Sequence, residues 1–169
     1  YFNLTENDIR NWRTYAKVSP PLRNKKNLDS IKKAILNNMI DCITSDHSPH
    51  DTDSKRLPFE QASAGVIGFE SLLPLTLELI NDNKLSINRL VELLSFNPSQ
   101  ILKLKSGTLK KRRPADLVLI NHNKNIKLSS TLIKSKSNNF PYENKSGRGK
   151  VILTIVDGKI VYNDRSFNI

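Results

Sequence analysis

The sequence predicts an α/β segment followed by a small all-β segment. In the first part, short apolar runs alternate with amphipathic helical patterns, which is typical of βαβ units and of a parallel sheet. Beyond Gly107 the pattern changes to one continuous apolar run and two alternating runs. The alternating runs are joined by Asp157-Gly158, a strong signal for a β-hairpin. We therefore place a boundary near residue 105 and expect two parts, residues 1–105 and 106–169.

The α/β part begins with a capped turn, a short strand and a helix. Thr5 to Arg13 opens with Thr-Glu-Asn-Asp, which predicts a capped helical turn. Thr14 to Ser19 is expected to form a strand that ends at Pro20-Pro21, because proline cannot donate to a ladder. Asp29 is expected to cap an amphipathic helix whose apolar positions recur at helical spacing, namely Ile31, Ala34, Ile35 and Met39.

The next predicted strand, Ile40 to Thr44, leads into Ser45-Asp46-His47-Ser48-Pro49-His50. Cys42 lies inside the apolar run, which predicts a buried and inert thiol. Reactive side chains gather at the carboxyl ends of parallel strands, where an aspartate can ligate a metal or act as a general base. The alternative is a polar loop in which Asp46 caps the next turn and the histidines are solvated. These residues alone leave both interpretations open.

The remaining elements follow from caps, turns and apolar spacing. After a polar loop, Asp51 to Ser63, we expect helices over Phe69–Asn81, Ser86–Ser95 and Asn97–Leu104. Ser86 and Asn97 serve as caps, Pro98 lies in a first turn, and Gly107 ends the last helix. The all-β part is expected to contain the strands Ala115–Asn121, Val151–Val156 and Lys159–Tyr162, with a long surface loop over Ser129–Arg148.

Composition narrows the classes of partner and compartment. A net charge of +11 would suggest nucleic acid or an anionic membrane. However, the lysines are scattered and aromatic residues do not alternate with them, so we expect no nucleic-acid partner. No apolar run approaches the roughly 20 residues that span a bilayer, so we expect no membrane partner. Cys42 is the only cysteine, which excludes an intrachain disulfide and fits a reducing cytosol. The chain starts at Tyr1 rather than Met, which suggests a processed, trimmed or truncated product.

A series of stretches carries a pattern that is more specific than any one of them: Lys17–Arg23, Thr44–His50, Pro58–Glu70, Asn97–Ser99, Pro114–Leu119, Ser135–Asn138 and Val156–Tyr162. In this order they resemble the C-terminal portion of the dihydroorotases, members of the cyclic amidohydrolase superfamily. The resemblance implies that residues 1–105 form the last two strands and helices of a metal-dependent (β/α)8 TIM barrel. Residues 106–169 would then contribute strands to a small composite β-sandwich domain.

The resemblance also implies an activity and roles for individual residues. Dihydroorotases are cytoplasmic zinc enzymes that reversibly hydrolyse dihydroorotate to N-carbamoyl-L-aspartate in pyrimidine (UMP) biosynthesis. Asp46 matches their metal ligand and catalytic base, and His50, Ala64 and Gly65 match their substrate contacts. Gly65 suits such a contact because a residue without a Cβ lets the backbone approach a flat ligand. Ser19 occupies the position of a substrate-binding asparagine in many members, and a hydroxyl offers fewer hydrogen bonds than an amide. No role carries over to His47 or His122, which we expect to bond locally and to be exposed, respectively.

The other zinc ligands of the family lie upstream of the matched portion: a His-x-His pair, an acidic or carboxylated-lysine bridge, and two later histidines. We therefore expect the N-terminal part of the same enzyme to complete the zinc site, and this chain alone to be inactive. Two alternatives remain open. One is a non-catalytic dihydroorotase-like assembly subunit, and the other is an allantoinase or hydantoinase-like cyclic amidase. The resemblance also suggests a homodimer, or association with aspartate transcarbamoylase.

Overall fold

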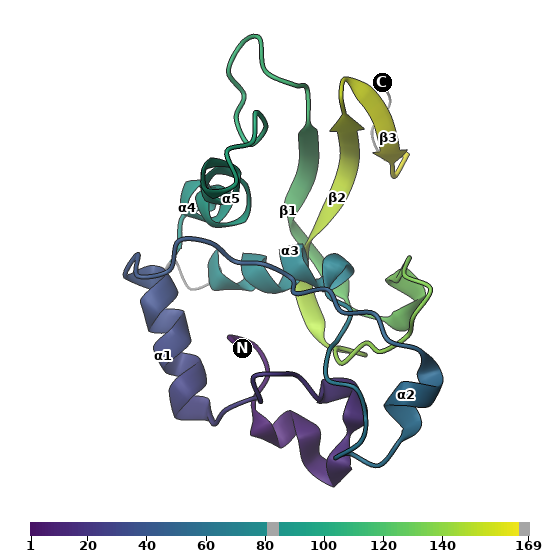
Figure 1. Ribbon diagram of the computed structural model, residues 1–169. Coiled ribbons are helices and arrows are strands. Elements are labelled where there is room, and N and C mark those ends of the chain that lie inside the picture. The colour runs from purple at the N-terminus through teal and green to yellow at the C-terminus, as the bar shows by residue number, and fades with distance from the viewer. Residues whose placement is uncertain (81–84, 166–169) are drawn as a thin grey trace.

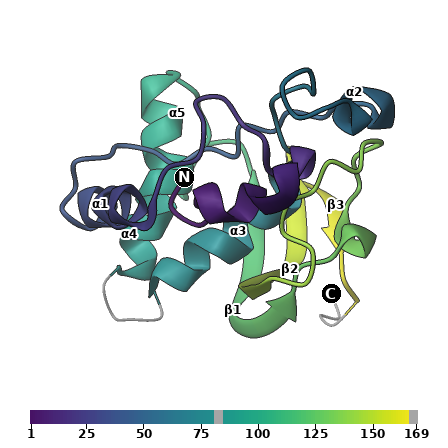
Figure 2. The ribbon, with the colours of Figure 1, turned by 90° about the horizontal axis from the view of Figure 1, so that it is seen from below.

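The computed structural model describes residues 1–80 and 85–165 of the chain. Its helices are α1 (Lys25–Leu36), α2 (Thr52–Arg56), α3 (Phe69–Leu77), α4 (Ile87–Val91) and α5 (Asn97–Ile101). Its strands are β1 (Leu117–Lys127), β2 (Ser146–Val156) and β3 (Lys159–Asn163). Segments of 3-10 helix cover Glu6–Trp12, Thr14–Ala16, Glu78–Ile80 and Ser130–Leu132. In two views, α3 lies between α1 and the sheet (Figures 1 and 2).

The three strands form an antiparallel sheet in the order β1-β2-β3. The predicted hairpin is confirmed, because Asp157 (φ 48°) and Gly158 (φ 74°) both adopt the left-handed backbone that a tight hairpin turn requires. Strand β1 runs six residues beyond the predicted end at Asn121, and β2 begins inside the predicted loop, at Ser146. The added part of β1 is mostly polar, and its pairing with β2 is interrupted after Asn121, so no apolar alternation marked it.

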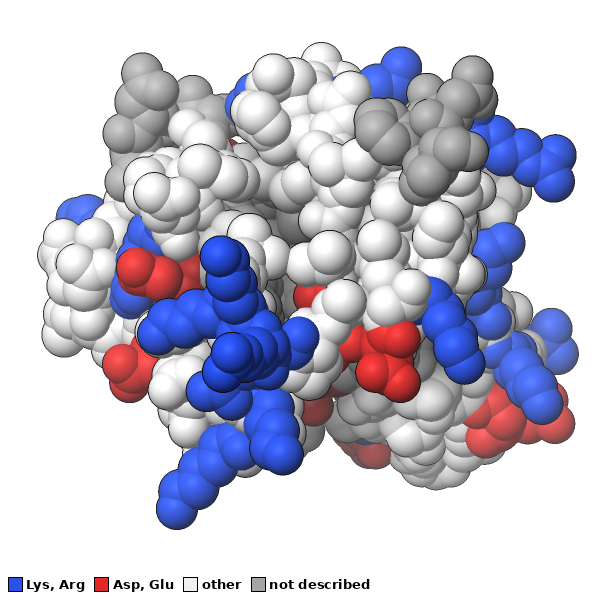
Figure 3. Space-filling view, turned by 90° about the horizontal axis from the view of Figure 1, so that it is seen from above, with Lys and Arg blue, Asp and Glu red and all other residues white. Residues whose placement is uncertain are grey.

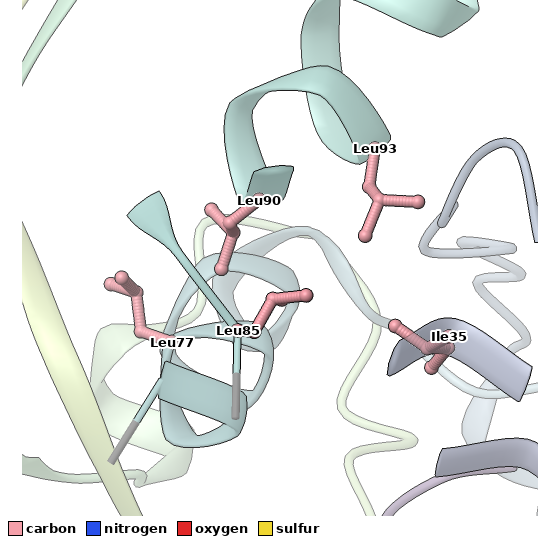
Figure 4. Close-up of a cluster of buried hydrophobic side chains, with 5 residues drawn as sticks. All are labelled: Ile35, Leu77, Leu85, Leu90 and Leu93. Carbon is pink, nitrogen blue, oxygen red and sulfur yellow. The ribbon is translucent and has the colours of Figure 1, made fainter. Parts of the chain in front are cut away.

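Two apolar clusters hold the elements together. The first joins α1, α3 and α4 through Ile35, Leu77, Leu85, Leu90 and Leu93 (Figure 4). The second joins α3 to the segment between β1 and β2 through Ile67, Leu75, Leu128 and Phe140. Helix α3 contributes to both clusters, and the second cluster contains residues from both sides of position 105.

The helices largely follow the predicted segments but differ at their ends. Asn24, rather than Asp29, caps α1, because its side chain accepts a hydrogen bond from the Asn27 N–H at 3.1 Å. Met39 lies beyond α1 and is 75% exposed. Helix α3 continues as a 3-10 turn to Ile80, and the predicted end at Asn81 lies outside the described residues. The cap on Thr5 is confirmed, since the Thr5 N–H donates to Asp8 Oδ2 at 2.7 Å.

The predicted break before Asn97 is absent. Ser86 caps α4 as expected, and its hydroxyl oxygen accepts from the Arg89 N–H at 3.1 Å. The chain then passes through a π-helical turn, Glu92–Phe96, directly into α5. Asn97 has helical angles (φ −62°, ψ −46°), and its side chain donates to the Asp41 carbonyl at 2.7 Å instead of capping a helix. Helix α5 ends at Ile101, six residues before Gly107.

Both strands predicted for the α/β part are wrong for the described structure. Thr14–Ala16 forms a 3-10 turn, and Ile40 to Thr44 adopts no regular secondary structure. Cys42 is exposed rather than buried. A strand needs a neighbouring strand to satisfy its N–H and C=O groups, and none pairs with either segment in the described structure. The expected parallel sheet is reduced to an isolated parallel bridge between His47 and Val66.

The segment between α5 and β1, at the top of Figure 1, is basic. Figure 3 shows Lys and Arg side chains gathered on the face seen from above. The exposed basic residues of this segment are Lys103, Lys105, Lys110, Lys111, Arg112 and Arg113. No aromatic residue lies among them, so the segment offers no surface on which bases could stack. The described helices are all too short or too polar to cross a bilayer.

Candidate functional site

A cavity of about 360 Å³ brings together several of the predicted site residues. Ser19, Asp46, Ala64 and Gly65 all line it. The start of the chain, the first two turns of α3 and Tyr142 also contribute to the wall. The volume lies within the range of small-molecule sites, which is roughly 300–1,000 Å³. The structure therefore gathers four of the predicted positions around one space that can hold a ring-sized ligand.

Asp46 is presented to this cavity by an unusual backbone. Its φ is +46°, a left-handed conformation that aspartate tolerates better than most residues. The Ser48 hydroxyl donates to the Asp46 carbonyl at 3.1 Å, and the Ser48 N–H donates to the Val66 carbonyl at 2.9 Å. The Asp46 carboxylate itself is exposed and accepts no hydrogen bond from the described residues. It is thus free to bind a ligand.

Tyr1 lies beside Asp46 on the cavity wall, and its hydroxyl donates to the Pro20 carbonyl at 2.7 Å. Burial and the negative charge of Asp46 raise the pKa of the Tyr1 phenol, which stays protonated at neutral pH.

His50 lies behind the cavity wall. Its Nε2 is 2.9 Å from the Ala64 carbonyl oxygen, and its backbone N–H donates to Asn139 Oδ1 at 3.3 Å. A Cβ added at Gly65 would come within 2.7 Å of His50 Nε2. In the described structure His50 therefore contacts the Ala64–Gly65 segment, which in turn lines the cavity.

The two histidines without a carried-over role behave as expected. His47 stacks on Phe69, with ring centroids 3.8 Å apart, and its Nδ1 accepts from the Gly68 N–H at 3.2 Å. The prediction of local hydrogen bonding at His47 is confirmed. His122 is exposed on β1, also as predicted.

The sequence reasoning missed two buried polar residues behind the cavity. Lys55 is 1% exposed, and its ammonium donates to the carbonyls of Ser63 at 2.8 Å and Gly65 at 3.0 Å. Asn139 is fully buried, and its amide donates to the carbonyls of Ser48 at 2.9 Å and Gly65 at 3.1 Å. Both residues occupy stretches that are polar in sequence, where no local pattern separates a buried lysine or asparagine from a solvated one.

The environment of Lys55 lowers the pKa of its ammonium group. Burial, and to a lesser extent the positive charge of Lys17, lowers the pKa of Lys55 to about 8. Lys17 itself donates to the carbonyls of Phe59 at 2.7 Å, Glu60 at 3.0 Å and Ala62 at 2.7 Å.

The described residues do not form a metal centre by themselves. Within residues 1–80 and 85–165, no group of three or more His, Cys, Asp or Glu side chains lies close enough to hold a metal ion. Asp46 could supply one ligand, but a zinc site in a protein needs three or more. Ligands from elsewhere would have to complete such a site.

Comparison with known proteins identifies the family of this chain. The sequence profile of the amidohydrolase family matches residues 5–161. The dihydroorotase of Ehrlichia canis (strain Jake) is 38% identical over 162 residues, which is 96% of this chain and 36% of the relative. The dihydroorotase of Trichlorobacter lovleyi is 38% identical over 165 residues, which is 98% of this chain and 39% of the relative. The chain thus spans well under half the length of these curated relatives.

Solved structures agree on the fold. The L-hydantoinase (dihydropyrimidinase) from Arthrobacter aurescens superimposes on the whole chain with a TM-score of 0.85 at 27% identity, over 39% of its own length. A D-hydantoinase superimposes on 99% of the chain with a TM-score of 0.87, and its 20% identity supports likeness of fold alone. Since the family profile extends over almost all of this sequence, including Ser19, Asp46, His50, Ala64 and Gly65, the chain belongs to the amidohydrolase family.

Proposed function

We propose that the polypeptide to which this chain belongs is a dihydroorotase, which interconverts dihydroorotate and N-carbamoyl-L-aspartate. The observation that carries the proposal is the Asp46 carboxylate, which is exposed at a ring-sized cavity whose wall also contains Ala64 and Gly65. Similar proteins support this substrate, since relatives at 34% and 40% identity are named dihydroorotases.

Hydrolysis of the cyclic amide requires the transfer of one proton from the attacking water to the departing nitrogen. In hydrolysis, a water oxygen adds to the carbonyl carbon of the cyclic amide and the ring C–N bond then breaks. Asp46 would take a proton from the attacking water and deliver it to the departing nitrogen. Ring closure runs the same steps in reverse. A carboxylate without a hydrogen-bonding partner in the described structure suits this exchange.

The flat ring of the substrate would lie against the Ala64–Gly65 backbone, where the absence of a Cβ on Gly65 allows close approach. Ser19, which is exposed on the cavity wall, would contact the substrate through its hydroxyl. His50 would affect substrate binding through the Ala64 carbonyl, to which its Nε2 is hydrogen-bonded.

Zinc is the cofactor that we propose, with Asp46 as one ligand and the others supplied by the remainder of the polypeptide. The same reasoning gives the proposed architecture. Residues 1–105 would complete a (β/α)8 barrel and residues 106–169 a small β-sandwich, in a cytoplasmic enzyme of pyrimidine synthesis. A homodimer or a complex with aspartate transcarbamoylase remains a proposal of the same kind.

A hydantoinase-like cyclic amidase is the second candidate, and two observations favour it. One structural neighbour, with a TM-score of 0.85 at 27% identity, is named a hydantoinase, and Ser19 stands where the resemblance implies a substrate-binding asparagine. Loss of the upstream histidines would instead indicate a non-catalytic assembly subunit.

The complete, metal-loaded polypeptide should be assayed with dihydroorotate, N-carbamoyl-L-aspartate, hydantoin, allantoin and dihydrouracil. We expect the highest kcat/KM with dihydroorotate, and ring closure of N-carbamoyl-L-aspartate in the reverse direction. A preference for hydantoin or allantoin would replace the proposal by the second candidate, and turnover of none of them would refute both.

A further inference from the structure

Lys55 is a buried cation without a counter-charge in the described structure. It is 1% exposed, and no carboxylate forms an ion pair with it among residues 1–80 and 85–165. Its two hydrogen bonds go to backbone carbonyls, those of Ser63 and Gly65. Burial of an ammonium group without an anion is costly, so a residue that serves packing alone would be expected to be apolar.

The carbonyls that Lys55 binds belong to the wall of the candidate site. The successive carbonyls of Ser63, Ala64 and Gly65 accept from Lys55, His50 and again Lys55, in that order. The Gly65 carbonyl accepts a second bond, from the Asn139 amide at 3.1 Å. Both Ala64 and Gly65 line the cavity, so these bonds fix the peptide planes that a ligand would meet.

Lys17 holds the same segment from its other end. Its ammonium donates to the carbonyls of Phe59, Glu60 and Ala62 and lies 5.3 Å from the centre of the Phe59 ring. Its own carbonyl accepts from the Gly65 N–H at 2.9 Å. The two lysines therefore bind backbone groups along the whole of residues 59–65, which contain no regular helix or strand of their own.

We propose that Lys55, assisted by Lys17, is a positioning residue that holds the Ala64–Gly65 backbone at the cavity wall and thereby sets the affinity for the cyclic amide. This inference rests on the proposed function for its kinetic test, and on the structure alone for its second test. Lys55 touches neither the substrate nor Asp46 in this scheme; it acts through the peptide groups that it binds.

The kinetic test compares Lys55→Met with Arg56→Met in the complete, metal-loaded polypeptide. Methionine matches the lysine side chain as far as Cε and removes its donors, while Arg56 is the exposed neighbour on the same helix. Loss of two charge-assisted bonds should raise the KM for dihydroorotate about tenfold or more in Lys55→Met. Its kcat should stay within about threefold of wild type, and Arg56→Met should leave KM unchanged. An unchanged KM in Lys55→Met, with a fall only in the active fraction or in kcat, would mean a merely structural role and would overturn the proposal.

Hydrogen–deuterium exchange supplies a test that does not depend on activity. The amides of residues 63–66 should exchange at least about tenfold faster in Lys55→Met than in Arg56→Met, and those of residues 59–62 should do so in Lys17→Met. Exchange in the first cluster, around Leu77 and Leu93, should be the same in all variants. Unchanged protection of residues 63–66 in Lys55→Met would refute the positioning role even if the enzyme acts on another amide. A wild-type protein inactive on every amide, but with the expected exchange pattern, would refute the proposed function and leave the positioning of this backbone by Lys55 standing.

Discussion

The imidazole of His50 occupies the space that a β-carbon on residue 65 would need. A Cβ on Gly65 would lie 2.7 Å from His50 Nε2 and 2.7 Å from Ser48 Cβ, closer than real β-carbons come to other atoms. The φ of Gly65 is +138°, which side chains rarely adopt. This close contact couples the Ser48–His50 segment to the Ala64–Gly65 segment, because a shift of one would displace the other.

Replacement of Gly65 by alanine should therefore damage binding more than folding. In Gly65→Ala, the new methyl group would push His50 and Ser48 outward or the Ala64–Gly65 backbone into the cavity. We expect the KM for dihydroorotate in the complete enzyme to rise by about tenfold or more. Gly158→Ala is the matched control, since Gly158 also has a positive φ (+74°) but nothing within 4 Å of its missing Cβ. That control should lose about 1–2 kcal/mol of stability, because alanine is strained at this φ, at unchanged KM. Equal KM values in the two variants would contradict the argument.

Asp46→Asn should remove the proposed proton carrier while preserving the shape of the side chain. Loss of a general acid–base group typically lowers kcat by about 10²–10⁴-fold. Steady-state kinetics in both directions would measure the effect, with metal content determined on the same samples. Asp53→Asn, an exposed substitution on α2, provides the control and should retain wild-type rates. If Asp46→Asn kept most of its kcat with a full complement of metal, another residue would have to carry the proton.

Protonation of Lys55 should leave a signature in the pH dependence of stability. Burial lowers the pKa of Lys55 from 10.5 to about 8, so between these values the unfolded chain binds one more proton than the folded one. The free energy of unfolding contributed by this group should therefore rise as pH increases from about 8 towards 10.5. The positive charge of Lys17 makes the smaller contribution to this lowering of the Lys55 pKa.

Urea denaturation of wild type and Lys55→Met across this pH range would isolate the contribution of Lys55. The difference in unfolding free energy between the two proteins should change with pH in the stated direction. A difference that stays constant above pH 8 would show that the folded protein keeps Lys55 protonated as readily as the unfolded chain does.

The isolated chain of 169 residues should neither retain zinc nor hydrolyse dihydroorotate, because its described residues include no cluster of three metal ligands. Elemental analysis after dialysis, together with an assay of the isolated product, would check both points. One equivalent of zinc with measurable turnover would contradict this expectation, whereas activity restored by adding the N-terminal part would support it.

Three predictions whose physical cause is local are confirmed. The Thr5 and Ser86 caps and the Asp157-Gly158 turn depend on residues within a few positions of each other, and all three form. The strand predicted for Ile40 to Thr44 depends on neighbouring strands, and the described residues supply none. Apolar content alone could not reveal that dependence.

Some residues of the candidate site could be placed from the sequence, and others could not. Asp46 and Gly65 could be placed through their resemblance to a family pattern, and the structure brings both to the same cavity. Lys55 and Asn139 could not, because their partners are backbone carbonyls that carry no residue-specific signal. The bond from Asn139 to Ser48 spans 91 positions of the chain, far beyond the reach of any local pattern.

Asn139 has a consequence for how such an enzyme could be redesigned. It belongs to the connection between β1 and β2, yet its amide satisfies carbonyls at both cavity segments, those of Ser48 and Gly65. A chimaera that joined residues 1–105 to the β-region of a distant homologue would strip those carbonyls of their donor unless an asparagine arrived at the same place. To exchange substrate preference between homologues, the β1–β2 connection would therefore have to be replaced together with the segments of Ser48 and Gly65.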